Sequence, residues 1–274
     1  MDGAPATRAI LDLLRSPAYV PAVQLTSLVV ARLLPMFLLT PVFGGQGVPA
    51  RLRFGIALAI SSVIAYALYR ADRPVLSAEH MILLVGKEVL LGLLFAVLLL
   101  VLFHALATFG SLVDLARGEG ALTVHDPHTQ HQQTVLSHFG LQLGATLFLT
   151  MGGAQMLLLT LGDSFHFAPV DALLPARLTP GAALPTLLAA AGDMFGVAVR
   201  LAAPVLLITL LVDVVLALVG RVAQQVDLSA LGLCVKGGLV LILLLFTLGI
   251  VVANFRREAL LSLERLQLLI GGET

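Results

Sequence analysis

Six long apolar runs, separated by short polar intervals, constrain this 274-residue chain more than any other feature. The runs cover residues 20–42, 54–69, 80–110, 139–161, 187–219 and 233–254. A helix needs about 20 apolar residues to cross a bilayer, and the second run is short by that measure. No polar interval is long enough to form a soluble domain. The sequence therefore predicts an all-α membrane protein of about six apolar helical segments, some of which need not be conventional spans.

Composition agrees with this prediction. Apolar residues make up 59% of the chain and charged residues 12%, and the mean hydropathy is +1.02. A soluble domain is about half apolar and about one quarter charged. The formal net charge is zero and no basic run is longer than Arg256-Arg257, so nucleic acid is not an expected partner. The lone Cys234 excludes a disulfide within the chain. We expect residues 1–274 to form a single polytopic membrane domain.

Residues 110–138, here called the waist, form a polar, glycine-punctuated interval between the third and fourth runs. Asp114 and Arg117 are three residues apart, so on a helix they share a face and can pair. Gly118 permits a turn, and Asp126-Pro127 favours extended or turn geometry. We expect the backbone to leave the helical path within the waist.

Two further intervals depart from the apolar pattern. A proline-rich link covers residues 162–186, and we expect its first residues to end the fourth helix, with Asp163 and Ser164 acting as a helix cap. The C-terminal tail, residues 255–274, alternates leucines with charged residues as an amphipathic helix does.

The charged residues inside apolar runs include Lys87, Glu88, Arg200, Asp213 and Lys236. A charge near the middle of a bilayer costs about 2.5–3.5 kcal/mol on insertion scales, so these side chains should face a protein interface or a water-filled cavity. Adjacent helical residues do not face each other, and we therefore expect Lys87 and Glu88 to have different partners.

Small residues recur at helix-packing intervals in the fourth and fifth runs. Gly140 and Gly144 are four apart, as are Gly192 and Gly196. Such spacing permits close approach of two helices in a membrane, although chance in a glycine-rich chain also produces it.

The sequence offers little support for catalysis or metal binding. Four histidines cluster in the waist, and the three of them at every third residue could share a helical face and bind a metal, but their spacing matches no standard ligand pattern, and a solvated loop explains them better. They are His125, His128, His131 and His138. Asp163-Ser164 near His166 lacks the strand-to-helix context of a hydrolase nucleophile. Asp114 and Asp213 lack the surroundings of a membrane aspartyl-protease dyad. We expect no enzymatic activity, no cofactor and no metal.

A series of weak motifs, taken in order over residues 28–245, resembles one known family. The motif residues are Pro41-Val42-Phe43-Gly44, Pro49, Arg53, Lys87-Glu88, Gly92, Gly110, Asp114, Arg117-Gly118, Asp126-Pro127, Leu147-Phe148-Leu149, Ser164-Phe165, Pro169, Pro204, Asp213, Arg221, Gln225 and Lys236. Their order and spacing resemble the export-gate subunit of type III secretion systems, the SctT/FliR family. Asp114, Arg117-Gly118 and the Gln132-Gln133-Thr134 that follows the waist proline are more similar to the injectisome branch than to the flagellar branch. Gln224-Gln225 stands where members of the family usually carry Pro-Gln.

The resemblance implies a subunit of the bacterial inner membrane that assembles with SctR-type and SctS-type subunits at the entrance of a secretion channel. It implies an SctU-type switch subunit as a further neighbour, secreted polypeptides in transit and contact with membrane lipid. Assembly or gating roles then fall to Pro41, Phe43, Gly44, Lys87, Glu88, Asp114, Arg117, Gly118, Asp126, Pro127, Phe165, Asp213, Arg221, Gln225 and Lys236. We expect the waist to lie near the channel lumen or its central constriction.

Two other functions remain open at this point. An autonomous small-molecule or ion transporter would place the same intramembrane charges around a midplane substrate site built from interrupted helices. Internal repeats would favour a transporter, and the two halves show no convincing pairing. A membrane enzyme is the third and weakest alternative.

Overall fold

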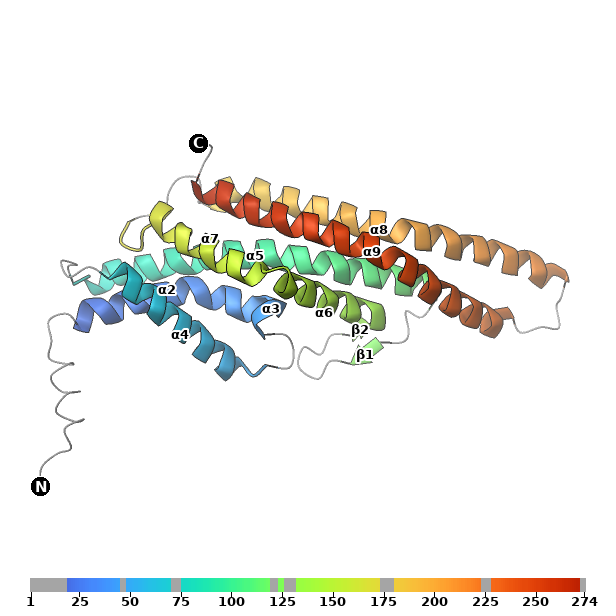
Figure 1. Ribbon diagram of the computed structural model, residues 1–274, viewed down its shortest axis with the longest axis horizontal. Helices are drawn as coiled ribbons and strands as arrows, with labels where there is room; N and C mark the ends of the chain where they lie inside the picture. The colour runs from blue at the N-terminus through green and yellow to red at the C-terminus, as the bar shows by residue number, and fades with distance from the viewer. Residues whose placement is uncertain are drawn as a thin grey trace, which may run out of the picture. The chain divides into compact units, whose positions relative to one another are not determined.

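The structure is a computed structural model that describes residues 19–44, 48–69, 75–118, 123–125, 132–172, 180–222 and 228–271. Its elements, in chain order, are α2 (Tyr19–Leu39), α3 (Pro41–Gly44), α4 (Ala50–Leu68), α5 (Ala78–Arg117), β1 (Thr123–His125), β2 (Gln132–Thr134), α6 (Val135–Thr150), α7 (Gly153–Phe167), α8 (Pro180–Val222) and α9 (Leu228–Gly271) (Figure 1). Helices dominate the described chain, as the sequence predicts.

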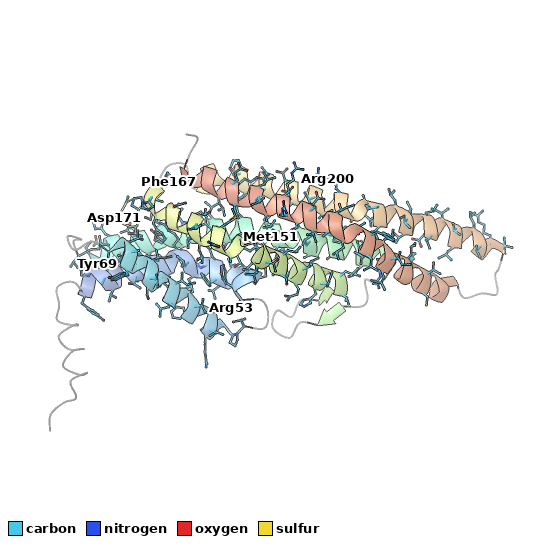
Figure 2. All side chains as sticks on the ribbon, viewed as in Figure 1. Arg53, Tyr69, Met151, Phe167, Asp171 and Arg200 are labelled. Atoms are coloured by element: carbon cyan, nitrogen blue, oxygen red, sulfur yellow. The ribbon has the colours of Figure 1, made fainter. Side chains whose placement is uncertain are left out.

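The apolar segments are long enough to cross a membrane. Five helices meet the requirements of length and composition: α2, α4, α5, α8 and α9. The pair α6 and α7 forms a sixth, bent segment, with an angle of 71° between its two helices. The break follows Met151, where Gly152 adopts a φ of +76° that other residues rarely adopt (Figure 2). The prediction of about six apolar helical segments is confirmed, and the short second run is part of a 19-residue helix.

The chain divides into two compact units. The first comprises the described parts of residues 1–97, 159–183 and 267–274, and the second those of residues 98–158 and 184–266. In the first unit, α2 packs along α4, which buries Ala57, Ser61 and Ala65 at four-residue spacing. These small side chains form one stripe of α4, so the two helix backbones can approach closely.

The core of the first unit also includes the beginning of α5. Leu28, Leu33 and Phe37 of α2 are buried. Gln24 fixes the segment before α5, because its side-chain amide both donates to the Leu76 carbonyl and accepts from the Leu76 N–H, each at 3.0 Å.

The second unit contains the end of α5 together with β1, β2, α6, α8 and most of α9. Two glycines set the packing of α5 against α6: a Cβ atom at Gly110 would overlap the Leu136 carbonyl, and one at Gly140 would overlap the Leu106 carbonyl. The predicted close approach at Gly140 is therefore confirmed. In contrast, a Cβ atom at Gly192 would meet nothing within 4 Å among the described residues, so Gly192 does not pack a helix pair in this part of the chain.

The backbone leaves the helix within the waist, as expected: helix α5 continues to Arg117, and the chain turns at Gly118, whose φ is +81°. Two other expected boundaries were wrong. Helix α7 continues to Phe167, so Ser164 lies inside a helix and is not a cap. The link is irregular only in part, because α8 already begins at Pro180. The tail is continuous with the last apolar run in α9.

The tail part of α9 is amphipathic, as expected. Its buried residues recur at intervals of three or four: Phe255, Ala259, Ser262, Leu263 and Leu266. The basic pair Arg256-Arg257 and Glu264 are exposed on the other side. Earlier in the helix this pattern is lost, because α9 is apolar there and many of its large side chains are exposed.

Candidate functional site

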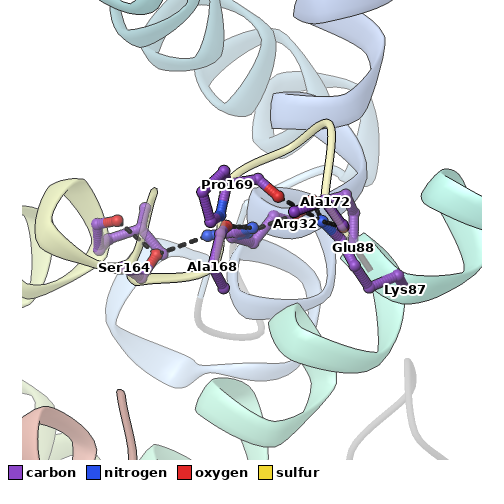
Figure 3. Close-up of polar contacts among 8 residues, drawn as sticks. Arg32, Lys87, Glu88, Ser164, Ala168, Pro169 and Ala172 are labelled. Carbon is purple, nitrogen blue, oxygen red and sulfur yellow. Dashed lines mark hydrogen bonds and ion pairs between the residues drawn. The ribbon is translucent and has the colours of Figure 1, made fainter. Parts of the chain in front are cut away.

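The first unit contains a buried ionic cluster inside its apolar segments. We call it the Arg32 cluster; it consists of Arg32 on α2, Lys87 and Glu88 on α5, Ser164 near the end of α7, and the turn Ala168–Ala172 (Figure 3). Arg32 and Glu88 have no exposed surface, and Lys87 is 7% exposed. Charges this deeply buried are retained only where close partners replace water.

Arg32 contacts three parts of the chain at once. Its Nε donates to Glu88, one terminal nitrogen donates to the Ser164 hydroxyl at 2.8 Å, and the other donates to the Ala168 carbonyl at 2.7 Å. The guanidinium also stacks 4.0 Å from the centre of the Phe165 ring. A planar guanidinium suits this site because its N–H donors point in several directions and its flat face can stack on an aromatic ring. A lysine ammonium has neither property.

Lys87 contacts the same turn from α5. Its Nζ donates to the Pro169 carbonyl at 2.6 Å and to the Ala172 carbonyl at 2.9 Å. The last carbonyls of a helix and of the turn after it lack intrahelical partners, and cations are favourable there. Arg32 and Lys87 together therefore satisfy the backbone that follows α7.

Glu88 joins the two cations. Its Oε2 accepts from Arg32, and its Oε1 lies 2.8 Å from the Lys87 ammonium. Asp171 adds a second negative charge near Lys87. Glu88 thus serves as the counterion of both buried cations, which limits the cost of burying the charges.

The expectation for Lys87 and Glu88 was right in one respect and wrong in another. Each has partners that the other lacks, namely the turn carbonyls and Arg32. They also contact each other, since the Lys87 ammonium lies 2.8 Å from Oε1 of Glu88. Sequence reasoning missed Arg32 and the buried role of Ser164. An arginine inside one apolar run and a glutamate inside another were the available signal.

A second polar site lies where α5 meets α6. Asp114 is buried, pairs with Arg117 at 3.5 Å, and accepts from the Leu136 N–H at 2.8 Å. Thr134, the N-cap residue of α6, makes no side-chain capping bond, so Asp114 supplies the capping acceptor from another helix. The predicted Asp114–Arg117 pair is confirmed, and Gly118 turns the chain directly after it.

The charges of α8 and α9 also find partners within the chain. Lys236 forms an ion pair with Asp213, and Arg265 pairs with Asp193 at 2.6 Å. Arg200 donates to the Gly196 carbonyl of its own helix at 3.1 Å. Arg221 lies in the last turn of α8, where a cation is favourable.

The remaining candidate residues do not form one site. Phe43 of α3 stacks on Phe37 with 4.3 Å between ring centres, and Pro41 and Gly44 begin and end that short helix. Asp126, Pro127 and Gln225 lie outside the described residues. Within the described ranges, no group of three or more His, Cys, Asp or Glu side chains is placed to hold a metal ion.

Comparison with known proteins identifies the family. The chain matches the family described as bacterial export proteins, family 1, over residues 23–261. The protein belongs to this family. All the residues of the Arg32 cluster and of the Asp114 site fall within the matched region.

The relatives include flagellar biosynthetic proteins and surface presentation of antigens proteins. The protein is 27% identical to the flagellar biosynthetic protein FliR of Bacillus subtilis over 89% of this chain and 93% of that relative. It is 29% identical to FliR of Escherichia coli over 73% and 75% of the two chains. It is 27% identical to the surface presentation of antigens protein SpaR of Shigella flexneri over 75% and 77%. The resemblance to the SctT/FliR family is thus confirmed, and the preference for the injectisome branch stays a prediction.

Family membership and the apolar helices agree on the location of the protein. This member of bacterial export family 1 is a multi-pass protein of the bacterial inner membrane and a component of a protein-export apparatus.

Proposed function

We propose that the protein is a noncatalytic export-gate subunit of a type III secretion system, and that it forms part of the channel entrance with SctR-type and SctS-type subunits. An SctU-type switch subunit is a further neighbour, and secreted polypeptides pass through the assembly. The match to bacterial export family 1 over residues 23–261 is the observation on which this proposal chiefly rests.

The exposed apolar surface of α8 and α9 supports a role in assembly. The two helices lie side by side, since Lys236 of α9 pairs with Asp213 of α8 (Figure 1). Their exposed apolar residues point in several directions around each helix and include Leu207, Leu210, Leu211, Leu218, Leu241, Leu245 and Phe246. A helix that is apolar on all sides is buried in lipid or in a larger protein assembly. Packing of partner helices against α8 and α9 would bury this surface.

The Arg32 cluster supports a structural rather than a catalytic role. Its cations bind main-chain carbonyls and a carboxylate, and its serine hydroxyl donates to the Leu161 carbonyl at 2.6 Å. These groups hold α2, α5 and the turn after α7 together. A transporter would need polar groups directed toward a midplane substrate, whereas these polar groups contact one another.

The waist is the part of the chain that we place near the lumen or the central constriction. Asp114 and Arg117 fix its first end, and β1 pairs with β2 in antiparallel register, with Val124 opposite Gln133. The waist is thus anchored at the α5–α6 junction by a buried carboxylate.

Secretion by cells that lack the endogenous protein tests this function. We expect the wild-type chain to restore secretion and the double variant Asp114→Ala/Arg117→Ala to restore much less. The control replaces two exposed charges of α9, Arg256→Gln and Glu264→Gln, and should secrete normally. Full secretion with both waist residues replaced would count against the waist as a gate element, and normal secretion without any copy of the chain would exclude the export function.

A further inference from the structure

Arg200 of α8 has no carboxylate partner among the described residues. Its side chain is exposed, and its Nε donates to the Gly196 carbonyl of its own helix at 3.1 Å (Figure 2). Neither terminal nitrogen of the guanidinium has a partner in this part of the chain. The two acidic residues of α8, Asp193 and Asp213, already pair with cations of α9. Arg200 therefore presents two nitrogens with unused N–H donors on the surface of an apolar helix.

Arg200 lies well inside the apolar part of α8. The membrane-length segment Leu184–Val222 has 39 residues. At about 1.5 Å per residue this segment is about 58 Å long, with Arg200 about 24 Å from its start. The stripe of α8 that is buried within the second unit comprises Met194, Val197, Ala198, Leu201 and Val205. Arg200 lies outside this stripe, on an exposed face that also carries Leu207 two turns later.

The residues next to Arg200 on this face are small. What we call the Arg200 face of α8 consists of Gly192, Gly196, Arg200, Ala203, Pro204 and Leu207. A Cβ atom at Gly192 would meet nothing within 4 Å among the described residues. Pro204 has no N–H, so the Arg200 carbonyl lacks the donor that normally binds it in a helix. Small residues in a membrane helix permit the backbone of another helix to approach closely.

Lipid alone cannot cover α8 along this face. The hydrocarbon core of a bilayer is about 30 Å thick, and even a tilt of about 40° would leave the apolar segment extending over roughly 45 Å of the bilayer normal. If the core is centred on the segment, Arg200 lies about 10 Å inside it, where a charge needs a partner group. If the core is shifted toward either end, much of the exposed apolar surface lies outside it. Both arrangements require protein against this side of α8.

We propose that a helix of a partner subunit packs on the Arg200 face and that a carboxylate of this helix pairs with Arg200. The inference rests on the proposed function, because it specifies the chemistry of one contact within the export assembly. A guanidinium whose terminal nitrogens are both available suits a bidentate contact with a carboxylate. A second copy of this chain does not suit the face, since a twofold contact there would bring two Arg200 side chains together.

The yield of the assembled complex tests the inference. The chain is co-expressed with its SctR-type and SctS-type partners, and the complex recovered per amount of chain in the membrane is measured by native mass spectrometry. Arg200→Leu should lower this yield about ten-fold or more, because it leaves the partner's carboxylate buried without a counterion. Arg256→Leu changes an exposed arginine in the tail of α9 and should leave the yield unchanged.

The possible outcomes separate this inference from the proposed function. An arginine that only reaches lipid headgroups tolerates leucine, so a normal yield of the Arg200→Leu complex would overturn the inference while the wild-type complex still supported the proposed function. A wild-type chain that forms no complex would refute both. Arg200 contacts only its own helix among the described residues, so the amount of the Arg200→Leu chain in the membrane should match wild type.

Photo-crosslinking identifies what covers the face while Arg200 is kept. A photo-reactive phenylalanine in place of Leu207, which is 66% exposed, should capture an SctR-type or SctS-type subunit at a helix that contains Asp or Glu. Capture of phospholipid alone, or of a second copy of this chain, would overturn the inference. Arg200→Glu should abolish assembly, and lysine in place of the captured carboxylate should restore it several-fold. Failure of every such lysine to restore assembly would contradict the pairing.

Discussion

The α5 backbone at Gly92 lies against the carbonyl oxygen of Arg32, so closely that a Cβ atom at residue 92 would overlap that oxygen. Glu88 lies one turn earlier on the same face of α5, where it binds the Arg32 side chain. The close crossing of α2 and α5 at Gly92 therefore determines how far the buried charges are apart.

Replacing Gly92 with alanine should destabilise the protein. The added methyl group meets rigid backbone, so α2 and α5 must separate and the Arg32–Glu88 contact must lengthen. Gly86→Ala on the same helix is the control, because a Cβ atom at Gly86 meets nothing within 4 Å among the described residues. Alanine in an open helical position stabilises by about 1 kcal/mol. The measurement is the melting temperature in detergent, with size-exclusion chromatography as the readout of folded protein. This temperature should fall for Gly92→Ala only. Equal melting temperatures for the two variants would contradict the close crossing.

Removing the charge of Glu88 should be more damaging than removing an exposed carboxylate. Glu88→Gln leaves Arg32 and Lys87 buried next to each other without their shared counterion, and breaking a buried pair costs about 3–5 kcal/mol. Glu79→Gln, in the exposed first turn of α5, should cost little. The measurement is the amount of full-length protein retained in membranes after a translation block. Equal half-lives for the two variants would show that the Arg32 cluster does not stabilise the fold.

Arg32→Lys should fail to replace arginine although the charge is kept. A lysine ammonium cannot reach Glu88, Ser164 and the Ala168 carbonyl together, and it loses the stack on Phe165. Each lost charged hydrogen bond costs about 1.5–3 kcal/mol. The loss should appear as faster proteolysis of the turn Ala168–Ala172, while Arg51→Lys on the exposed side of α4 should be cleaved like wild type. An unchanged cleavage pattern in Arg32→Lys would mean that charge alone is sufficient.

Asp114 should control the start of α6. Asp114→Ala removes the acceptor of the Leu136 N–H, so this amide should exchange with solvent faster in hydrogen–deuterium exchange. Asp114→Asn keeps an acceptor oxygen and should exchange at an intermediate rate. Protection of Leu136 that is the same in all three proteins would refute the capping role of Asp114.

Local features were predictable from the sequence. The apolar runs fix the number of segments, because few structures other than helices can cross a bilayer. Asp114 and Arg117 were predictable as a pair since they are three residues apart on one helix. The close approach at Gly140 followed from the small-residue spacing.

Non-local features were not predictable in this way. Arg32 and Glu88 are 56 residues apart and Arg32 and Ser164 are 132 apart, and no periodicity connects them. Ser164 fits the pattern of a helix cap, but tertiary contact with Arg32 keeps it inside α7. The break at Gly152 was missed because an uninterrupted apolar run predicts a single helix, and one residue with positive φ is enough to end it.

Native mass spectrometry of the protein co-expressed with its SctR-type and SctS-type partners tests the central claim most directly. An export-gate subunit should appear in a defined complex with both partners and should be poorly stable when it is expressed alone. A protein that remains monomeric or forms homo-oligomers in the presence of those partners, and is equally stable without them, would contradict the assignment.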